Sequence, residues 1–207
     1  MLKIWGRENS TNVKKALWCA DELGLAYEHV NAGGPYGVVN TPEYRALNPN
    51  GLVPCIQDDG FTLWESNSIV RYFCATHAAG TLFYPDDPKQ RAHAEKWMDW
   101  CISTFTPSFR VAFMNLVRTA PEKRDMAAVE KGLQACERNL AILDAALADS
   151  PYLSGESFGM GDIPMGSLVY SWLKMPIEHP EFKHLEAWYE RLTQRPQYQK
   201  RVMLPLT

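Results

Sequence analysis

The pattern of apolar and polar residues changes near residue 85. Before that point, short β-type stretches alternate with helical ones, and after it nearly all of the chain shows the three- and four-residue spacing of amphipathic helices. The first part predicts strands at residues 2–5, 27–30, 53–57 and 61–64, and helices at 13–23, 42–46 and 65–75. The last two strands flank Asp58-Asp59-Gly60, a hairpin turn signal. The order βαβαββα predicts a four-stranded mixed sheet with helices packed on it.

Beyond residue 85 the pattern predicts an all-helical structure. Trp97, Cys101, Phe105 and Phe109 recur every fourth residue along one long helix, and a second long helix covers residues 129–147. We expect these two helices to pair as an antiparallel hairpin within a helical bundle. Shorter helices are expected at 163–173 and 182–192, after which Arg195-Pro196 ends the run.

The segment between the two patterns is polar and bounded by prolines. Pro85, Asp86, Asp87 and Pro88 are typical of a connection between domains. We therefore predict an α/β domain at residues 1–80, a linker at 81–87 and an all-helical domain at 88–207.

Composition narrows the choice of partners. The chain has 207 residues, 46% hydrophobic and 22% charged, which is ordinary for a globular protein with a sizeable core. A net charge of −3 without a basic stripe gives no reason to expect nucleic acid or an anionic membrane as a partner. The N-terminus lacks the apolar stretch of a secretory signal and no apolar run is long enough to span a membrane, so we expect a cytoplasmic protein. Five cysteines without C-x-x-C or metal-like spacing predict reduced thiols and no metal site.

The stretch NPNGLVPCI, from Asn48 to Ile56, crowds turn residues against an apolar strand. Pro54 cannot donate a hydrogen bond to a sheet, so we expect it at a sheet edge or a bend. A proline in such a place, particularly a cis one, usually marks a tight, functional turn.

Three segments carry a resemblance to a known family: GRENSTNVKKALWCADELGL after the first strand, NPNGLVPCI, and LWESNSIVRYF. With an α/β half followed by an all-helical half, the chain resembles the soluble glutathione transferase superfamily over essentially its whole length, and within it the bacterial, theta-like, serine-type members. The most specific feature is the pair Glu65-Ser66 between the last strand and its helix. The resemblance implies a thioredoxin-like first domain with a cis-proline at Pro54, and glutathione as a co-substrate with no metal or redox cofactor.

The resemblance also implies a glutathione site in the first domain. Val53, in front of the cis-proline, would offer its backbone N–H and C=O to the cysteinyl part of glutathione, with Leu52 and Pro54 beside it. Ser66 lies at or near a helix N-terminus, where backbone N–H groups and the helix dipole favour a carboxylate. Glu65 would accept a hydrogen bond from the γ-glutamyl ammonium group.

The thiol of glutathione must be ionised to react. Lowering the pKa of a thiol by about two units requires about 2.7 kcal/mol of preferential stabilisation of the anion, most of which a hydroxyl donor and a helix dipole can provide. Ser10 falls on the position of the family's catalytic serine. Asn12, also a predicted glutathione-binding residue, is the alternative because an amide N–H donates equally well. A third interpretation is that Ser10, Thr11 and Asn12 only cap the helix. The loop contains no tyrosine or cysteine, which argues against the tyrosine-type and cysteine-type chemistries.

The family's second-substrate pocket lies between the domains. Phe105, Phe109 and Phe113, at one-turn spacing, are the candidates to line it, although an aromatic stripe of this kind more often forms core. Candidates for the basic residue that holds the glycyl carboxylate of glutathione are Arg71, Arg110 and Arg118.

The stretch FGMGDIPMG departs from the family pattern. The family's buried aspartate at the start of a central helix is present as Asp162, but Gly159 replaces the serine or threonine that caps the helix. Because a glycine cap is only a few tenths of a kcal/mol worse, we expect Asp162 to keep its role in folding.

The sequence therefore predicts a glutathione transferase that activates the thiolate for attack on a hydrophobic electrophile. Two alternatives are a glutathione-dependent oxidoreductase acting on disulfides or peroxides and a non-enzymatic binding module with the same fold. Trp64 at a sheet edge, and Trp97 and Met98 on the long helix, leave apolar surface that needs cover, which predicts a homodimer.

Overall fold

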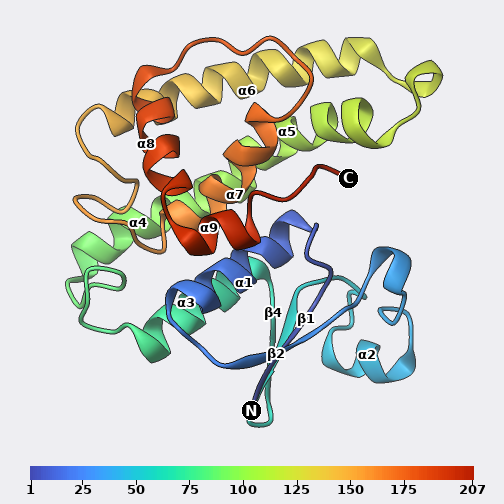
Figure 1. Cartoon of the computed structure of the whole chain (residues 1–207), viewed down its shortest axis with the longest axis vertical. Helices are drawn as coiled ribbons and strands as arrows, with labels where there is room; N and C mark the ends of the chain where they lie inside the picture. The colour runs from blue at the N-terminus through green and yellow to red at the C-terminus, as the bar shows by residue number, and fades with distance from the viewer.

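In the computed structural model, which describes residues 1–207, a small sheet with its helices is followed by a larger group of helices (Figure 1). The order βαβαββα of the first half confirms the predicted fold class. The elements of this half are β1 (Leu2–Trp5), α1 (Thr11–Glu22), β2 (Tyr27–Val30), α2 (Pro42–Leu47), β3 (Cys55–Asp58), β4 (Phe61–Trp64) and α3 (Ser66–His77), with a 3-10 turn at Gly34–Tyr36.

The sheet has the strand order β2-β1-β3-β4. β1 runs parallel to β2 and antiparallel to β3, and β3 pairs antiparallel with β4. Ile4 lies opposite Ile56, and both side chains are fully buried in the main core with residues of α1 and α3. On the other face, Cys55 packs with Tyr44 of α2, whose ring stands edge-on to Trp5 at 5.9 Å. The alternation of side chains along each strand thus supplies both faces of the sheet.

The second half is all-helical, as the sequence predicts. Its first long helical run turns back through the 3-10 turn Pro121–Lys123 and pairs antiparallel with α6 (Figure 1). The elements are α4 (Pro88–Trp100), the π-helix η2 (Cys101–Phe105), α5 (Thr106–Phe113), the π-helix η3 (Met114–Arg118), α6 (Met126–Leu147), α7 (Asp162–Leu173), α8 (Lys183–Thr193) and α9 (Pro196–Arg201). The division into residues 1–80, 81–87 and 88–207 stays a prediction.

The four-residue periodicity predicted one regular long helix. The structure differs, because the long run is not one regular helix. Pro107 has no N–H to donate to the preceding turn. The hydroxyl of Thr106 donates to the carbonyl oxygen of Cys101 at 2.6 Å, five residues back. The missing N–H of Pro107 and the hydrogen bond of Thr106 to a carbonyl five residues back both fit a wider helical turn. This gives a physical reason for the π-helical segment before α5.

Two further differences from the prediction occur at prolines. β3 begins at Cys55 instead of residue 53, because Pro54 cannot donate to the sheet. Pro196, expected to end the helical run, begins the additional helix α9. A proline at the first helical position loses no hydrogen bond, since the N–H there has no partner within the helix.

A single apolar core of 39 buried residues spans both halves. Trp18 of α1 packs against Phe158 and Tyr198 of the second half, with ring centroids 5.3 Å and 4.8 Å apart. A Cβ atom on Gly166 of α7 would lie 3.0 Å from the Trp18 ring and from Leu192. The two halves are therefore close-packed, which fixes the N-terminal end of α1 relative to the helical half.

Asp162 organises the turn in front of α7, in keeping with its expected role in folding. Its Oδ1 accepts hydrogen bonds from the N–H of Leu153 and from Nε1 of Trp188, both at 2.8 Å, and its Oδ2 accepts from the N–H of Gly159 at 3.0 Å. Burial raises the pKa of Asp162, and these donors oppose that rise. The residue that caps α7 is Gly161, not Gly159, because residues 159–162 close a turn of their own before the helix begins.

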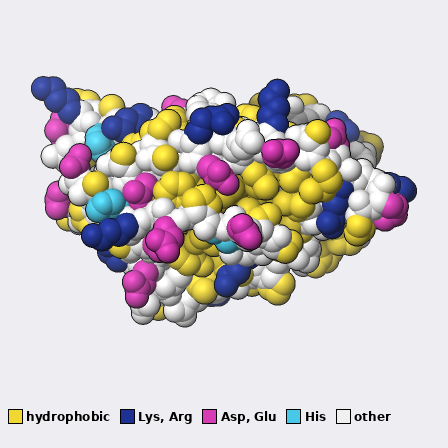
Figure 2. Space-filling model, turned by 90° about the horizontal axis from the view of Figure 1, so that it is seen from above, with side chains coloured by type: hydrophobic (Ala, Val, Ile, Leu, Met, Phe, Trp, Pro, Cys, Tyr) yellow, Lys and Arg dark blue, Asp and Glu magenta, His cyan; other side chains and the backbone are white.

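Figure 2 shows the face that carries α6, where apolar atoms form broad areas between scattered charged groups. Ile142 and Met126 of α6 are among the exposed large apolar side chains, at 52% and 57% exposure.

None of the helices combines the length and hydropathy needed to cross a bilayer.

Candidate functional site

The N-terminal turn of α1, the segment 48–54 and the junction of β4 with α3 meet around a small cavity of ≈ 60 Å³. All six residues predicted to bind glutathione line it: Asn12, Leu52, Val53, Pro54, Glu65 and Ser66. They come from three places in the sequence, and the fold brings them together because α1 and α3 pack side by side above β1 and β3 (Figure 1).

Hydrogen bonds from side chains hold the backbone of the segment 48–54 in place. The carbonyl oxygen of Leu52 accepts hydrogen bonds from the Tyr44 hydroxyl at 2.7 Å and from Nδ2 of Asn48 at 2.8 Å. Oδ1 of the buried Asn48 in turn accepts from the backbone N–H of Asn50 at 3.1 Å. These bonds fix the backbone that leads into Val53.

Val53 presents unpaired backbone to the cavity. The peptide bond between Val53 and Pro54 is cis, as the resemblance implies. Neither the N–H nor the C=O of Val53 has a hydrogen-bond partner within the chain, and β3 begins only at Cys55. Both groups are therefore free to pair with an extended peptide, as the edge of a sheet would.

Glu65 and Ser66 form the start of α3. Glu65 precedes the helix with a φ of 75°, a conformation that side-chain-bearing residues seldom adopt, and its carboxylate is exposed and makes no cap hydrogen bond. Ser66 is buried, and its hydroxyl donates to Oδ1 of Asn12 at 3.3 Å. The first N–H groups of α3 thus lie beside a hydroxyl and a carboxylate, an arrangement suited to an amino acid's charged groups.

The two candidates for the thiol partner occupy different environments. Ser10 caps α1 and is buried, and its side chain makes no cap hydrogen bond. It does not line the cavity, whereas Asn12, in the first turn of α1, does. Asn12 is exposed, and its Oδ1 is already engaged by Ser66.

The two lysines that follow are buried. Nζ of Lys14 donates to the carbonyl oxygen of Val202 at 2.9 Å, and burial lowers the pKa of Lys14 to about 8. Burial lowers the pKa of Lys15 as well, although the charges of Cys101 and Glu65 oppose the shift. Lys15 is buried, and its charge interacts with that of Glu65, which lines the cavity.

The aromatic stripe lies in the core. Phe105 and Phe109 stack with ring centroids 5.7 Å apart, and Phe113 follows at 5.4 Å. All three belong to the 39-residue core, with Phe113 the most exposed at 9%. Their assignment to the second-substrate pocket stays a prediction, and Phe113 is the one nearest to solvent.

Sequence reasoning did not assign three residues that also line the cavity: Asn48, Asn50 and Trp64. The two asparagines lie inside the motif NPNGLVPCI, where they were interpreted as turn residues only. The bond from the Asn50 N–H to the Asn48 side chain could have been suspected from the tendency of asparagine side chains to bond to backbone two residues on.

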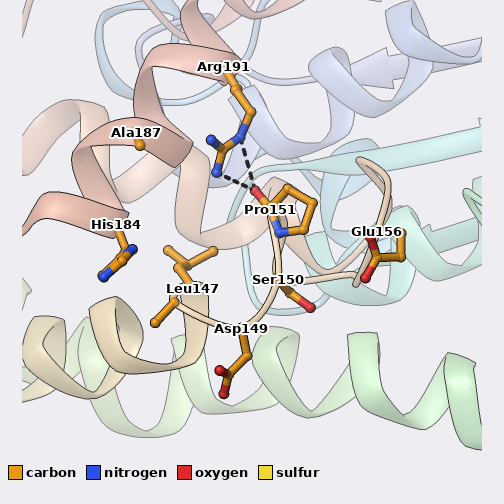
Figure 3. A pocket seen from close by; sticks show the side chains of 9 residues that line it. Leu147, Asp149, Ser150, Pro151, Glu156, His184, Ala187 and Arg191 are labelled. Carbon is orange, nitrogen blue, oxygen red and sulfur yellow. Dashed lines mark hydrogen bonds between the residues drawn. The ribbon is translucent and has the colours of Figure 1, made fainter.

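Another cavity, of ≈ 280 Å³, lies between the end of α6, the segment after it and α8. Figure 3 shows Arg191 donating from Nε and Nη2 to the carbonyl oxygen of Pro151, at 3.1 Å and 2.6 Å. None of the predicted site residues lies there. No cluster of three or more His, Cys, Asp or Glu side chains could hold a metal ion.

Comparison with protein families matches both halves of the chain. Residues 5–81 match the N-terminal domain of glutathione S-transferase, and residues 92–196 match its C-terminal domain.

Individual relatives match along the whole chain. Glutathione S-transferase GstB of Escherichia coli (strain K12) is 44% identical over 209 residues, covering 100% of both chains. Glutathione S-transferase F14 of Arabidopsis thaliana is 32% identical and covers 97% of this chain and 80% of its own. Among solved structures, a theta class glutathione S-transferase from Xanthomonas axonopodis pv. citri with glutathione bound has a TM-score of 0.96 at 54% identity, covering 100% of this chain and 99% of that one.

Proposed function

Because the chain belongs to the glutathione S-transferase family and is a glutathione transferase, we propose that it binds glutathione in the cavity between α1, the segment 48–54 and α3. The thiol then attacks a hydrophobic electrophile held between the two halves. The observation that carries the proposal is the convergence of the six predicted residues on one cavity that offers a free peptide edge, a helix N-terminus and a carboxylate.

The γ-glutamyl end of glutathione lies at the start of α3. Its carboxylate accepts from the Ser66 hydroxyl and from the first N–H groups of the helix, and its ammonium group donates to the exposed carboxylate of Glu65. The cysteinyl residue pairs with the N–H and C=O of Val53. These contacts leave the thiol pointing toward the N-terminus of α1.

The Ser10 hydroxyl stabilises the thiolate, aided by the positive end of the α1 dipole. Two observations support Ser10 over Asn12. The Ser10 hydroxyl makes no cap hydrogen bond to its own helix, whereas Oδ1 of Asn12 already accepts a hydrogen bond from Ser66. Asn12 is the alternative, because it lines the cavity and an amide N–H donates equally well. In substitution, the thiolate sulfur forms a bond to the electrophilic carbon while the leaving group departs with the electrons of the broken bond, and the thiol proton goes to solvent.

The proposal includes a homodimer that works in the cytoplasm. Trp97 and Met98, which the sequence predicted to need cover, are buried within the chain. The apolar side chains that remain in contact with water near the sheet edge and on the long helical run, and so support an interface, are Phe61, Trp64 and Ile102. Five free cysteines fit a reducing compartment. Sedimentation at micromolar concentration should give close to twice the chain mass of 23.5 kDa, and a fully active monomer would remove this part of the proposal.

Glutathione binding and turnover test the function itself. Calorimetry of the folded protein should show one glutathione per chain, and steady-state assays should show conjugation of a neutral aryl or benzyl halide. Reduction of disulfides or peroxides without any conjugation would favour the oxidoreductase instead. A folded chain that binds no glutathione would overturn the proposal.

A further inference from the structure

Two arginines that the proposed function does not use converge from the two halves of the chain. Arg7 lies in the loop between β1 and α1, and Arg118 is the last residue of η3. Burial lowers the pKa of Arg7, and the positive charge of Arg118 lowers it further. Arg7 takes part in none of the ion pairs of the chain, and Arg118 donates its hydrogen bond to the main-chain oxygen of Thr207.

The acidic residue next to Arg7, Glu8, lies close to other basic side chains. Glu8 pairs with Arg201 at 2.9 Å and lies 3.8 Å from His29. The positive charge of Arg7 is therefore left without a carboxylate, although its side chain is partly buried. A partly buried cation beside a second cation is an unfavourable arrangement that a bound anion would relieve.

Arg7 lies beside the glutathione cavity. A Cβ atom on Gly33 would be 3.4 Å from Nη1 of Arg7 and 3.4 Å from both methyl groups of Val53, so the guanidinium and the Val53 side chain flank the same point. A Cβ atom on Gly34 would be 3.0 Å from Cδ of Arg7. The absence of side chains at these two glycines is what lets Arg7 lie there.

Arg118 lies at the end of the aromatic stripe. Its Cζ is 5.4 Å from the centroid of the Phe113 ring, and its Nε donates to the main-chain oxygen of Thr207 at 3.0 Å. Nδ2 of Asn9, two residues after Arg7, donates to the hydroxyl of the same Thr207. Thr207 thus ties the end of η3 to the loop that carries Arg7 and Ser10.

On the basis of the proposed function, we propose that Arg7 and Arg118 form a carboxylate-binding site for the second substrate, so that the enzyme prefers electrophiles that carry a carboxylate. The guanidinium group is planar and matches a carboxylate with paired N–H donors. The six residues around the glutathione cavity all belong to the first half, whereas Arg118 and Phe113 belong to the second. An anion that touches both arginines therefore belongs to a ligand lying between the halves, which is where the electrophile is held.

A matched pair of substrates tests the inference: 4-(bromomethyl)benzoate and its uncharged methyl ester. In both, the glutathione sulfur forms a bond to the benzylic carbon as the carbon–bromine bond breaks, bromide leaves, and the thiol proton goes to solvent. The readout is the ratio of kcat/KM for the acid to that for the ester, corrected for the uncatalysed rates. Arg7→Gln and Arg118→Gln should each lower this ratio about fivefold, and the double variant about tenfold or more.

Arg138→Gln is the matched control, since Arg138 is an exposed arginine on α6 without an ion pair. It should leave the ratio unchanged, and added salt should slow the acid more than the ester in the native chain and in this control, but not in the double variant. Calorimetry of glutathione binding confirms that each variant is folded and binds its co-substrate.

Two results would overturn the inference. An unchanged ratio in the folded double variant would show that the arginines do not contact the second substrate. An unchanged ratio with glutathione affinity lowered in both single variants would assign the arginines to the glycyl carboxylate of glutathione instead. A native chain that conjugates neither compound and binds no glutathione would overturn the proposed function, a result recognisable before any variant is made.

Discussion

The contact between Ser66 and the γ-glutamyl carboxylate leads to a quantitative prediction for Ser66→Ala. In the free protein the Ser66 hydroxyl donates to Asn12 over 3.3 Å, which is long for a bond between these groups, so its loss should lower the free energy of unfolding by less than about 1 kcal/mol. With glutathione bound, the same hydroxyl donates to a charged carboxylate. Such bonds contribute about 1.5–3 kcal/mol, so the Kd for glutathione should rise about tenfold to a hundredfold.

Calorimetry measures the Kd, and urea unfolding measures the stability of the same variants. Ser68→Ala is the matched control, because Ser68 lies in the same first turn of α3 but does not line the cavity and makes no hydrogen bond. It should bind glutathione as the native chain does. The N–H groups of α3 remain in both variants, so binding is weakened and not abolished. An unchanged Kd in folded Ser66→Ala, or an equal loss in Ser68→Ala, would refute the assignment.

Three further predictions concern binding, pH dependence and packing. Glu65→Gln should weaken glutathione binding by about 1–3 kcal/mol in calorimetry, because it removes the charge that faces the ammonium group; unchanged affinity would contradict this. Burial lowers the pKa of Lys14 to about 8, whereas an unfolded lysine has a pKa of about 10.4. Between these two pH values the unfolded chain binds the proton more tightly than the folded one, so this residue makes the free energy of unfolding rise with pH. Urea unfolding at both ends of the window should show a smaller rise in Lys14→Met, and an identical rise would contradict the assignment. Gly166→Ala should destabilise the chain by about 1–3 kcal/mol in urea, because its Cβ would crowd the Trp18 ring and Leu192; an unaffected variant would mean that α1 and α7 can separate without cost.

Much of the fold could be predicted because local pattern and tertiary packing agree. β1, β2 and β4 have the predicted bounds, since each is a short run with aromatic or β-branched residues that turn residues end. The π-helical segment η2 and the helix α9 were missed because they depend on how a proline's missing N–H is accommodated, and the apolar period does not report that.

The candidate site could be predicted less completely. The six glutathione-binding candidates were found through the motifs of the resemblance, and they do converge. The supporting bonds of Asn48 and Tyr44 to Leu52 escaped prediction because they join residues whose proximity depends on the loop's path. Lys14 and Lys15 lie in the first turns of a helix whose far side is core, and sequence alone did not indicate that both would be buried.

Ionisation of bound glutathione is the most direct test of the central claim. The ultraviolet absorbance of the thiolate, followed against pH in the binary complex, gives the pKa of the bound thiol. We expect a pKa about two units below that of free glutathione, and a return toward the free value in Ser10→Ala while glutathione still binds. A shift caused by Asn12→Ala and not by Ser10→Ala would move the role to Asn12, and a bound thiol that titrates like free glutathione would contradict the claim that this site activates it.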